Sequence, residues 1–556
     1  MAITRFAVLL AILLVLSVGS IHVFTDVLPW KTTMKYSSSI LSETTTKQYR
    51  SHGVQIGNQD TVETETHTWN VSTGFIGSRG QTSALKTEVI FLSDVNSTYQ
   101  GDIITLRLHA RDDNGRRRYL GGDLWRAAIY NTTSRFGSMG KVIDHDNGTY
   151  TVHFYAGFSG QVVVQIMLVL QREAIKHQKL FLLPMEFRGY WNGTFRHDDI
   201  TENSICFTQR EGHWNDMCEY PHPRALGNTV FLCRPPKSLG CNTLIGISAT
   251  RSGNNKLSSN FTHQFEKPDA PRVIKGFNDR LLIQSGVKSG INTYSVPRCE
   301  SDLLEPLVTG YWLGMRWYSL VCQNREWNHA KEVQKCLQDK DVYFIGDSTT
   351  RQWYQQMLDI AGYPINATDD NWRKRVNTIP GDYNVSGEDA YDMIVTDLKN
   401  NINFTFHHHA LSLHRFVPIS RFPYSIDVLD ELTAPKCNYV IVISLWAHFD
   451  SWTTDSYTER LSMIAIGIQR LRERCPNTVI AIKGSHERND MLNYWIHYDM
   501  NRIMKDVFRG HGVFFIDIWD MNFAFVAAHQ GTMTIHMPMT LIKEEVYMFL
   551  SHACLK

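Results

Sequence analysis

The spacing of hydrophobic residues changes along the chain, and the change separates two kinds of structure. In the first half, apolar and polar positions alternate, as at Ile104, Leu106 and Leu108, which predicts half-buried strands. A turn signal at Asn147–Gly148 precedes another alternating segment, and an apolar strand is predicted over 162–170. Several short strands at this spacing predict an all-β, Ig-like sandwich.

Beyond about residue 300, apolar runs alternate with segments of helical periodicity. Strands are predicted over 341–346, 439–445, 478–483 and 512–518, and helices over 349–361, 457–474, 488–508 and 540–553. Nearly continuous apolar strands separated by helices predict a parallel sheet covered on both faces, an α/β/α arrangement. Sites in such folds lie at the carboxyl ends of the strands.

The start of the chain has the composition of a secretory-pathway entry signal. Arg5 precedes an apolar run over 6–24, which is just long enough to span a bilayer as a helix. Small residues at 18–20 also form an acceptable cleavage site. A cleaved signal peptide and an uncleaved type II anchor therefore both stay open. No other segment is expected to span a membrane, so the rest of the protein is predicted to be luminal or extracellular, either secreted or held in the Golgi.

Changes in composition predict the division of the chain. The signal or anchor occupies 1–24, and the Ser-, Thr- and Lys-rich segment 25–68 has little periodicity, as in a stem or linker. Residues 69–295 hold the β pattern and then a segment rich in Cys, Pro and Gly. Residues 296–556 hold the α/β pattern.

Charge and cysteine content support this picture. A net charge of +1 with 43% hydrophobic residues describes a globular protein and gives no nucleic-acid footprint. The ten cysteines, an even number without a CxxC pair, suit disulfides in an oxidising compartment. A local, loop-rich knot is predicted for Cys206, Cys218, Cys233 and Cys241. The chain carries nine N-glycosylation acceptors, at Asn70, Asn96, Asn131, Asn147, Asn192, Asn260, Asn366, Asn384 and Asn403.

The strongest chemical signal is the tripeptide Gly346–Asp347–Ser348, where a predicted strand ends and a helix begins. Gly346 lets the backbone turn and leaves room for a ligand. Ser348 would lie where free backbone N–H groups and the positive end of the helix stabilise an oxyanion. Ser348 is therefore a candidate nucleophile that needs a histidine as its base. The same tripeptide is also an ordinary turn sequence.

Several histidines are candidates for that base. His536 lies on a late loop before the last predicted helix, at the edge of the sheet where Ser348 is expected. His448 is a candidate donor to an oxyanion, and His486 follows another strand. The run His407–His409 is interpreted as a solvated turn, and no metal site is predicted.

Longer motifs resemble a known family. The segment Gly346–Gln352 resembles the GDS block of the PC-esterase branch of SGNH/GDSL-like hydrolases, and further motifs fit that branch at Gly310–Trp312 with Cys322, Ser444–Phe449, and Ile535–Pro538 with Cys554. The first half is similar to neurexophilin at Ala110–Arg116, Gly121–Asp123 and Asp144–Tyr150. In this order the two halves resemble the neurexophilin and PC-esterase domain (NXPE) family over about residues 70–556.

The resemblance implies an Ig-like domain followed by an SGNH-like α/β/α domain that acts on O-acyl groups of glycans or glycoproteins. It implies esterase or O-acetyltransferase chemistry, for example on sialic acid, with Ser348 as nucleophile, His536 as base and Arg351 one helical turn after the nucleophile. No cofactor is implied beyond acetyl-CoA as an acyl donor. The neurexophilin-like half implies a cell-surface partner such as a neurexin.

One position departs from the family pattern. The wider branch has an aspartate three residues before the catalytic histidine, where this chain has Met533. Asp517 and Asp520 are the alternative carboxylates for orienting His536. Losing the orienting carboxylate of a serine triad can lower turnover by about 10⁴-fold. The alternative function is therefore a binding protein of weak or no catalytic activity.

Overall fold

The computed structural model describes most of the chain from residue 80 onward. The described ranges are 80–183, 189–210, 212, 215–249, 272–286, 296–363, 383–386, 392–409, 411, 416–419, 424–488 and 494–554. They all belong to one compact unit, 67–556. The predicted signal or anchor and stem lie outside these ranges, as do Asn70, Asn260 and Asn366. No helix within them is both long enough and apolar enough to cross a membrane.

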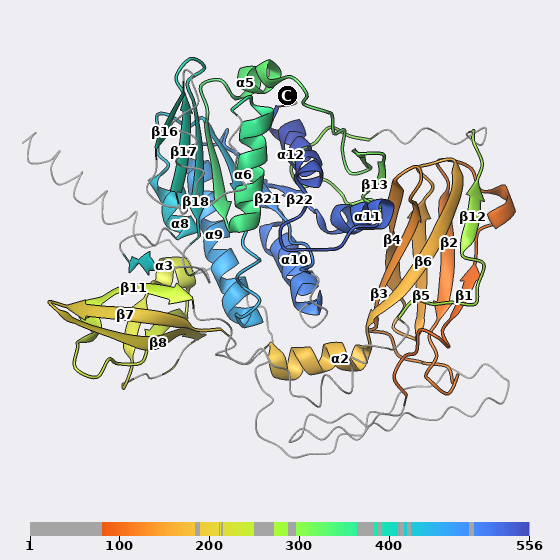
Figure 1. The fold of residues 1–556 in the computed structure, drawn as a ribbon, viewed down its shortest axis with the longest axis horizontal. Helices are drawn as coiled ribbons and strands as arrows, with labels where there is room; N and C mark the ends of the chain where they lie inside the picture. The colour runs from red at the N-terminus through yellow and green to blue at the C-terminus, as the bar shows by residue number, and fades with distance from the viewer. Residues whose placement is uncertain are drawn as a thin grey trace, which may run out of the picture. The chain divides into compact units, whose positions relative to one another are not determined.

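The alternating segments of the first half form a nine-stranded antiparallel sheet in the order β1-β2-β5-β4-β3-β6-β12, with the hairpin β13–β14 joined to β4 (Figure 1). Its strands are β1 (Glu88–Phe91), β2 (Ile103–His109), β3 (Leu124–Asn131), β4 (Phe136–Asp144), β5 (Thr149–Tyr155), β6 (Gly160–Leu170), β12 (Arg280–Ile283), β13 (Gly310–Leu313) and β14 (Arg316–Ser319). The sheet encloses its own hydrophobic core, to which the alternating Ile104, Leu106 and Leu108 belong. The β-rich first half is therefore confirmed.

The hairpin β13–β14 lies after the predicted boundary at 295/296 but pairs with a strand that lies before it. Tyr311 and Trp312 pair with Ser138 and Gly137 of β4, so the sheet of the first half is completed by residues from the second. The indole Nε1 of Trp312 donates to the carbonyl of Met521 at 2.8 Å. The two parts of the chain therefore share secondary structure as well as packing.

The cysteine-rich segment supplies five strands of a six-stranded antiparallel sheet in the order β19-β11-β7-β8-β10-β9, and the second half of the chain supplies β19. Its strands are β7 (Trp191–His197), β8 (Ile200–Arg210), β9 (Cys218–Pro221), β10 (Thr229–Cys233), β11 (Leu244–Ala249) and β19 (Val417–Pro418). Disulfides join Cys206 to Cys233 and Cys218 to Cys241. The pairing is local, as predicted, but the segment is a sheet and not a loop-rich knot.

The α/β pattern gives a seven-stranded sheet in the order β16-β17-β18-β15-β20-β21-β22. Its strands are β15 (Asp341–Gly346), β16 (Tyr383–Ser386), β17 (Asp392–Asp397), β18 (Ile402–His408), β20 (Tyr439–Ile443), β21 (Val479–Lys483) and β22 (Phe514–Ile516). From β18 to β22 all neighbours are parallel, whereas β16 and β17 form an antiparallel edge. The sheet is mixed, which corrects the prediction of a purely parallel one.

The helices predicted between these strands are present. They are α6 (Ser348–Ile360), α9 (Thr454–Arg474), α10 (Tyr494–Phe508) and α12 (Met539–Cys554), joined by the unpredicted α5 (Ala330–Leu337), α8 (Ser425–Glu431) and α11 (Trp519–His529). Helix α6 packs on β15, β18 and α12, and α9 packs on α8 and α10 (Figure 1). Helix α11 packs against β3, β4 and β13 of the first sheet.

All ten cysteines are paired. Besides the two local bridges, disulfides join Cys299 to Cys322, Cys336 to Cys554 and Cys437 to Cys475. Five disulfides are consistent with a protein of the secretory pathway.

The described N-glycosylation acceptors differ in the surroundings of their side chains. Asn96 and Asn147 are exposed. The side-chain Nδ2 of Asn131 donates a hydrogen bond to Gln161, and that of Asn403 donates one to Asp341.

Candidate active site

A close turn at Gly346 brings strand β15 into helix α6. A Cβ at this position would lie 2.5 Å from the carbonyl oxygen of Ser444 and also overlap the side chain of Thr350. Only glycine leaves room for the neighbouring strand end and for the first turn of the helix. The turn therefore fixes where Ser348 begins α6.

Asp347 caps this helix and is fully buried. One of its oxygens accepts the backbone N–H of Thr349 at 2.8 Å and the hydroxyl of the same residue at 2.7 Å. The other accepts the backbone N–H of Ala447 at 3.0 Å. The carboxylate thus joins the turn before Ser348 to the loop after β20.

The electrostatics of Asp347 keep it ionised. Burial by itself would raise the pKa of its carboxyl. The charges of His448, Lys483 and His409, together with the hydrogen bond from Thr349, outweigh burial and hold the pKa well below its usual range. A negative cap at the amino end of α6 is favoured by the helix dipole.

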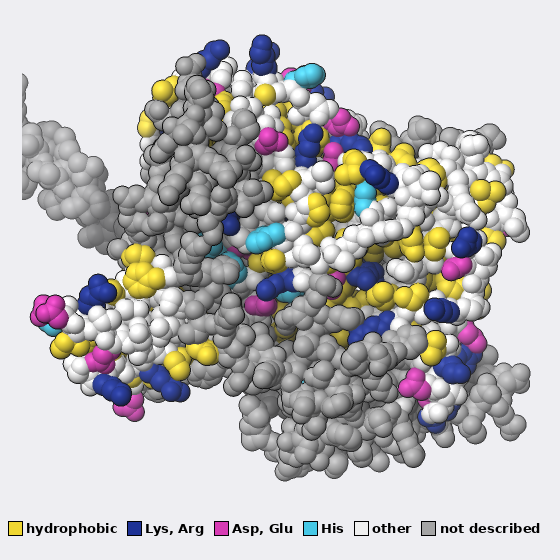
Figure 2. Space-filling view, in the orientation of Figure 1, with side chains coloured by type: hydrophobic (Ala, Val, Ile, Leu, Met, Phe, Trp, Pro, Cys, Tyr) yellow, Lys and Arg dark blue, Asp and Glu magenta, His cyan; other side chains and the backbone are white. Residues whose placement is uncertain are grey.

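Ser348 and His536 meet at this turn. The Nε2 atom of His536 lies 2.8 Å from Ser348 Oγ, although the two residues are 188 positions apart. Ser348 is nearly buried, whereas His536 is exposed. Figure 2 shows histidine side chains near the middle of one face of the molecule. The separation is that of a hydrogen bond between a nucleophile and its base.

Two contacts hold the loop that carries His536. His486 Nε2 lies 3.2 Å from the carbonyl oxygens of Thr534 and Ile535, so this nitrogen carries the proton and donates. Burial, followed by the charge of Lys483, lowers the pKa of His486 to about 3 and keeps the ring neutral.

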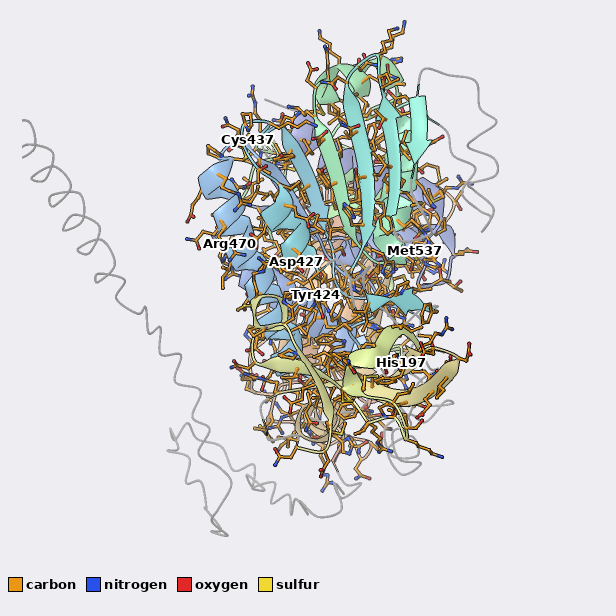
Figure 3. The ribbon with its side chains drawn as sticks, turned by 90° about the vertical axis from the view of Figure 1, so that its left-hand side faces the viewer. His197, Tyr424, Asp427, Cys437, Arg470 and Met537 are labelled. Carbon is orange, nitrogen blue, oxygen red and sulfur yellow. A yellow bond between two sulfur atoms is a disulfide. The ribbon has the colours of Figure 1, made fainter. Side chains whose placement is uncertain are left out.

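The second contact that holds this loop comes from α6, where Gln352 donates to the carbonyl of Met537 at 3.0 Å. Figure 3 shows Met537 near the ends of the sheet strands. His536 is therefore held against the helix that carries Ser348.

The strands on either side of β15 contribute further histidines. His408 ends β18 and His409 follows it; both are buried, which corrects the interpretation of the His407–His409 run as a solvated turn. His409 Nε2 lies 3.2 Å from Nδ1 of His448, which follows β20. Burial lowers the pKa of His409 well below its ordinary value. Within the described ranges, no group of three or more potential ligands is arranged to hold a metal ion.

Asp517 and Asp520 do not orient His536. Asp517 accepts from Lys505 Nζ at 3.0 Å, from Asn501 at 3.1 Å and from the backbone N–H of Trp519. Asp520 accepts from the hydroxyl of Thr309 at 3.4 Å. Asp517 lies between β22 and α11, and Asp520 lies in the first turn of α11, which packs against the first sheet, so both carboxylates are engaged away from Ser348. Arg351 lies half-buried in the first turn of α6.

Asp520 should instead affect stability. Burial and then the neighbouring Asp517 raise its pKa from 3.8 to about 7. Between these values the folded protein holds a proton that the unfolded chain has released, so this group's contribution to stability falls as pH rises. Asp520→Asn removes the charge. We therefore expect the stability gained by this variant to be greater at pH 8 than at pH 5, by on the order of 2 kcal/mol.

Thermal unfolding of Asp520→Asn and of the unchanged protein at the two pH values measures this difference. The surface variant Asp506→Asn serves as a control, because its carboxylate is exposed on α10 and Arg509 is its one ion-pair partner within the described part of the chain. An equal effect of Asp520→Asn at both pH values would contradict the expectation.

Some residues of the site were not found from the sequence. Lys483 and Thr349 contact each other beside Ser348, and the indole of Trp446 joins them. The available signal was a lysine that ends the apolar strand Val479–Lys483, at the same edge of the sheet as Gly346. That signal does not predict which residue Lys483 contacts, because Lys483 and Thr349 are distant in the sequence.

The fold and site together define a two-part protein: antiparallel β-sheets precede a mixed α/β part that carries a serine–histidine pair at a strand-to-helix turn. Residues 317–554 match the family model of the NXPE family member 4-like C-terminal domain, and residues 96–257 match that of neurexophilin. The chain belongs to the neurexophilin and PC-esterase domain (NXPE) family.

Similarity to solved structures adds little. The bacterial integrin-binding protein invasin is 9% identical, with a TM-score of 0.13, and the match covers 59% of this chain. The chain spans 60% of the length of that structure. A likeness of this size carries no argument about fold or function.

Proposed function

We propose that the C-terminal part is a serine acyl-transfer enzyme of the SGNH type that acts on O-acyl groups of glycans or glycoproteins. The observation that carries the proposal is the 2.8 Å separation of Ser348 Oγ and His536 Nε2 at the amino end of α6. Membership of the family supports the same chemistry. The position at the carboxyl ends of parallel strands, with β18 on one side of β15 and β20 on the other, is typical of active sites in open α/β sheets.

The proposed reaction has two steps. Ser348 Oγ attacks the acyl carbonyl carbon while His536 Nε2 takes the hydroxyl proton. The tetrahedral intermediate collapses, the bond from the carbonyl carbon to the leaving group breaks, and His536 returns the proton to that group. Water or a sugar hydroxyl then attacks the acyl-serine while His536 takes its proton. The bond from the carbonyl carbon to Ser348 Oγ breaks, and His536 returns the proton to Oγ, which completes hydrolysis or transfer respectively.

The amino end of α6 supplies the oxyanion donor. Among the described residues, the backbone N–H of Ser348 donates to no protein acceptor, because it lies in the first turn of the helix. The helix dipole favours negative charge at this position. His448 remains the proposed second donor, from the loop after β20.

The proposed substrate is an O-acetyl group on a glycan, with sialic acid as the specific case. For transfer, acetyl-CoA is the proposed acyl donor. These assignments rest on the family and leave esterase and transferase as outcomes of the test.

Labelling of the full-length protein with a fluorophosphonate tests the proposal. In this reaction, Ser348 Oγ attacks phosphorus, fluoride leaves and His536 accepts the proton. Peptide mass spectrometry should locate the adduct on Ser348, and Ser348→Ala should carry none. Acetate release from an O-acetylated sialoglycan would assign an esterase, and acetyl transfer from acetyl-CoA a transferase. Absence of labelling at Ser348 in the unchanged, folded protein would overturn the proposal.

Recognition of a cell-surface partner, such as a neurexin, is the second proposed function. It rests on the neurexophilin match over 96–257, which lies largely outside the α/β part. Binding by this part would be unchanged in Ser348→Ala. Loss of partner binding in that variant, with the fold retained, would argue against a separate binding function.

A further inference from the structure

A lysine is buried beside the nucleophile turn. Lys483, the last residue of β21, has no solvent-exposed surface. Its Nζ lies 5.7 Å from the ring centroid of Trp353 and 5.8 Å from that of Trp446. Burying an ammonium group is costly unless it is paired, so the surroundings should show what the charge does.

The lysine has one hydrogen-bond acceptor among the described residues, the hydroxyl of Thr349, at 3.1 Å. Thr349 Oγ1 also accepts from Trp446 Nε1 at 3.2 Å and donates to Asp347 at 2.7 Å. A hydroxyl has one proton to donate and two lone pairs. All three are used, so the direction of each hydrogen bond is fixed.

Two carboxylates offset the charge of Lys483 at longer range. Burial lowers its pKa, while Glu545 and Asp347 raise it. Glu545 is itself fixed, because it accepts from Trp353 Nε1 at 2.5 Å and from Asn522 at 2.7 Å. The ammonium group therefore lies inside a closed polar network with its donor aimed at Thr349.

Thr349 is the residue after the nucleophile. Its backbone N–H and its hydroxyl both bind the capping oxygen of Asp347, so a shift of Thr349 would shift the whole first turn of α6. Ser348 lies between Asp347 and Thr349, and among the described residues its only polar side-chain contact is with His536. The orientation of Ser348 Oγ therefore depends on its two neighbours.

We propose that Lys483 is a positioning residue for Ser348, which acts by holding the Thr349 hydroxyl and, through it, the Asp347 cap. This inference rests on the proposed function of Ser348. Lys483 touches neither Ser348 nor His536, and its full burial keeps it from any substrate. It should therefore affect the rate of attack and not the binding of the reagent.

The test measures kinact and KI of fluorophosphonate labelling in the full-length protein. Lys483→Met keeps the length of the side chain without its charge, and Thr349→Val keeps the β-branch without the hydroxyl. Each should lower kinact by about 10- to 100-fold with KI unchanged, because small displacements of a nucleophile cost rates of this order. The double variant should be no slower than either single one, since both remove the same interaction.

Two controls separate positioning from general destabilisation. Thr349→Ser retains the hydroxyl and should keep kinact near that of the unchanged protein. Ile468→Ala removes buried volume from α9 and should lower the melting temperature without changing kinact. If Lys483→Met does not fold, the contrast between Thr349→Val and Thr349→Ser decides.

The outcomes are distinguishable. If the unchanged protein is not labelled at Ser348, the proposed function fails. If it is labelled, but Lys483→Met reacts equally fast, or the two substitutions have additive effects, the positioning role of Lys483 is overturned while the proposed function stands.

Discussion

Replacing His536 by glutamine will lower the rate of fluorophosphonate labelling of Ser348 by about 10²–10⁴-fold, the range expected for loss of a positioned general base. Glutamine keeps a polar side chain of similar reach, but its amide does not accept a proton at neutral pH. The serine, its helix and the Asp347 cap remain in place. The measurement is kinact for His536→Gln relative to the unchanged protein.

His529→Gln is the matched control for this experiment. His529 lies near the end of α11, where its two ring nitrogens face the carbonyl oxygens of Phe525 and Gly314, and it does not contact Ser348. Its kinact should stay unchanged. A His536→Gln protein that is labelled at the full rate would show that another group activates the serine.

The second large effect is expected from Gly346→Ala. A methyl group at this position would overlap the backbone carbonyl of Ser444 and the side chain of Thr350, so strand β20 and helix α6 could not both keep their places. The backbone atoms of two packed elements have little room to move apart and relieve such an overlap. We expect a loss of about 3 kcal/mol or more in the free energy of unfolding, at or above the upper end for overpacked cores.

Denaturant unfolding of the purified protein measures this loss, and failure of the variant to accumulate in folded form would agree with it. Gly531→Ala is the control, because its Cβ would come no closer than 3.9 Å to any other atom. A Gly346→Ala protein as stable as the Gly531→Ala protein would contradict the close packing at the turn.

The strand and helix on either side of the turn at Ser348 were predicted from the sequence because their signals are local. The apolar run Asp341–Gly346 becomes β15, and the periodic apolar residues after Ser348 become α6. The pairing of Ser348 with His536 came from motif resemblance and from the rule that strand ends share an edge. No local pattern relates two residues 188 positions apart.

Helix α11 shows why other elements were missed. Its sequence over Trp519–His529 is apolar on nearly all sides, since it packs against the first sheet as well as the second half of the chain. A helix without a polar face has no amphipathic period to detect. The same helix carries Asp520 away from His536, so the missed element and the wrong orienting carboxylate have one cause.

The mixed sheet and the cysteine-rich sheet were missed for a different reason. Strands β16 and β17 form an antiparallel edge, and the hydrophobic periodicity of a sequence does not show whether a strand runs parallel or antiparallel to its neighbour. Strand β8 (Ile200–Arg210) is largely polar, and its exposed residues lie in its first half, so its sequence lacks the alternation of apolar and polar residues that marks a strand.

The hairpin β13–β14 has a consequence for any attempt to divide the protein. A fragment that stops at residue 295 would lack the partner strand that Tyr311 and Trp312 provide to β4, and would leave that sheet edge open to self-association. A fragment that starts at 296 would carry a hairpin with no sheet to join. Fragment-based binding studies of the neurexophilin-like part therefore need an end point beyond Ser319, or the intact chain, before a negative result can be interpreted.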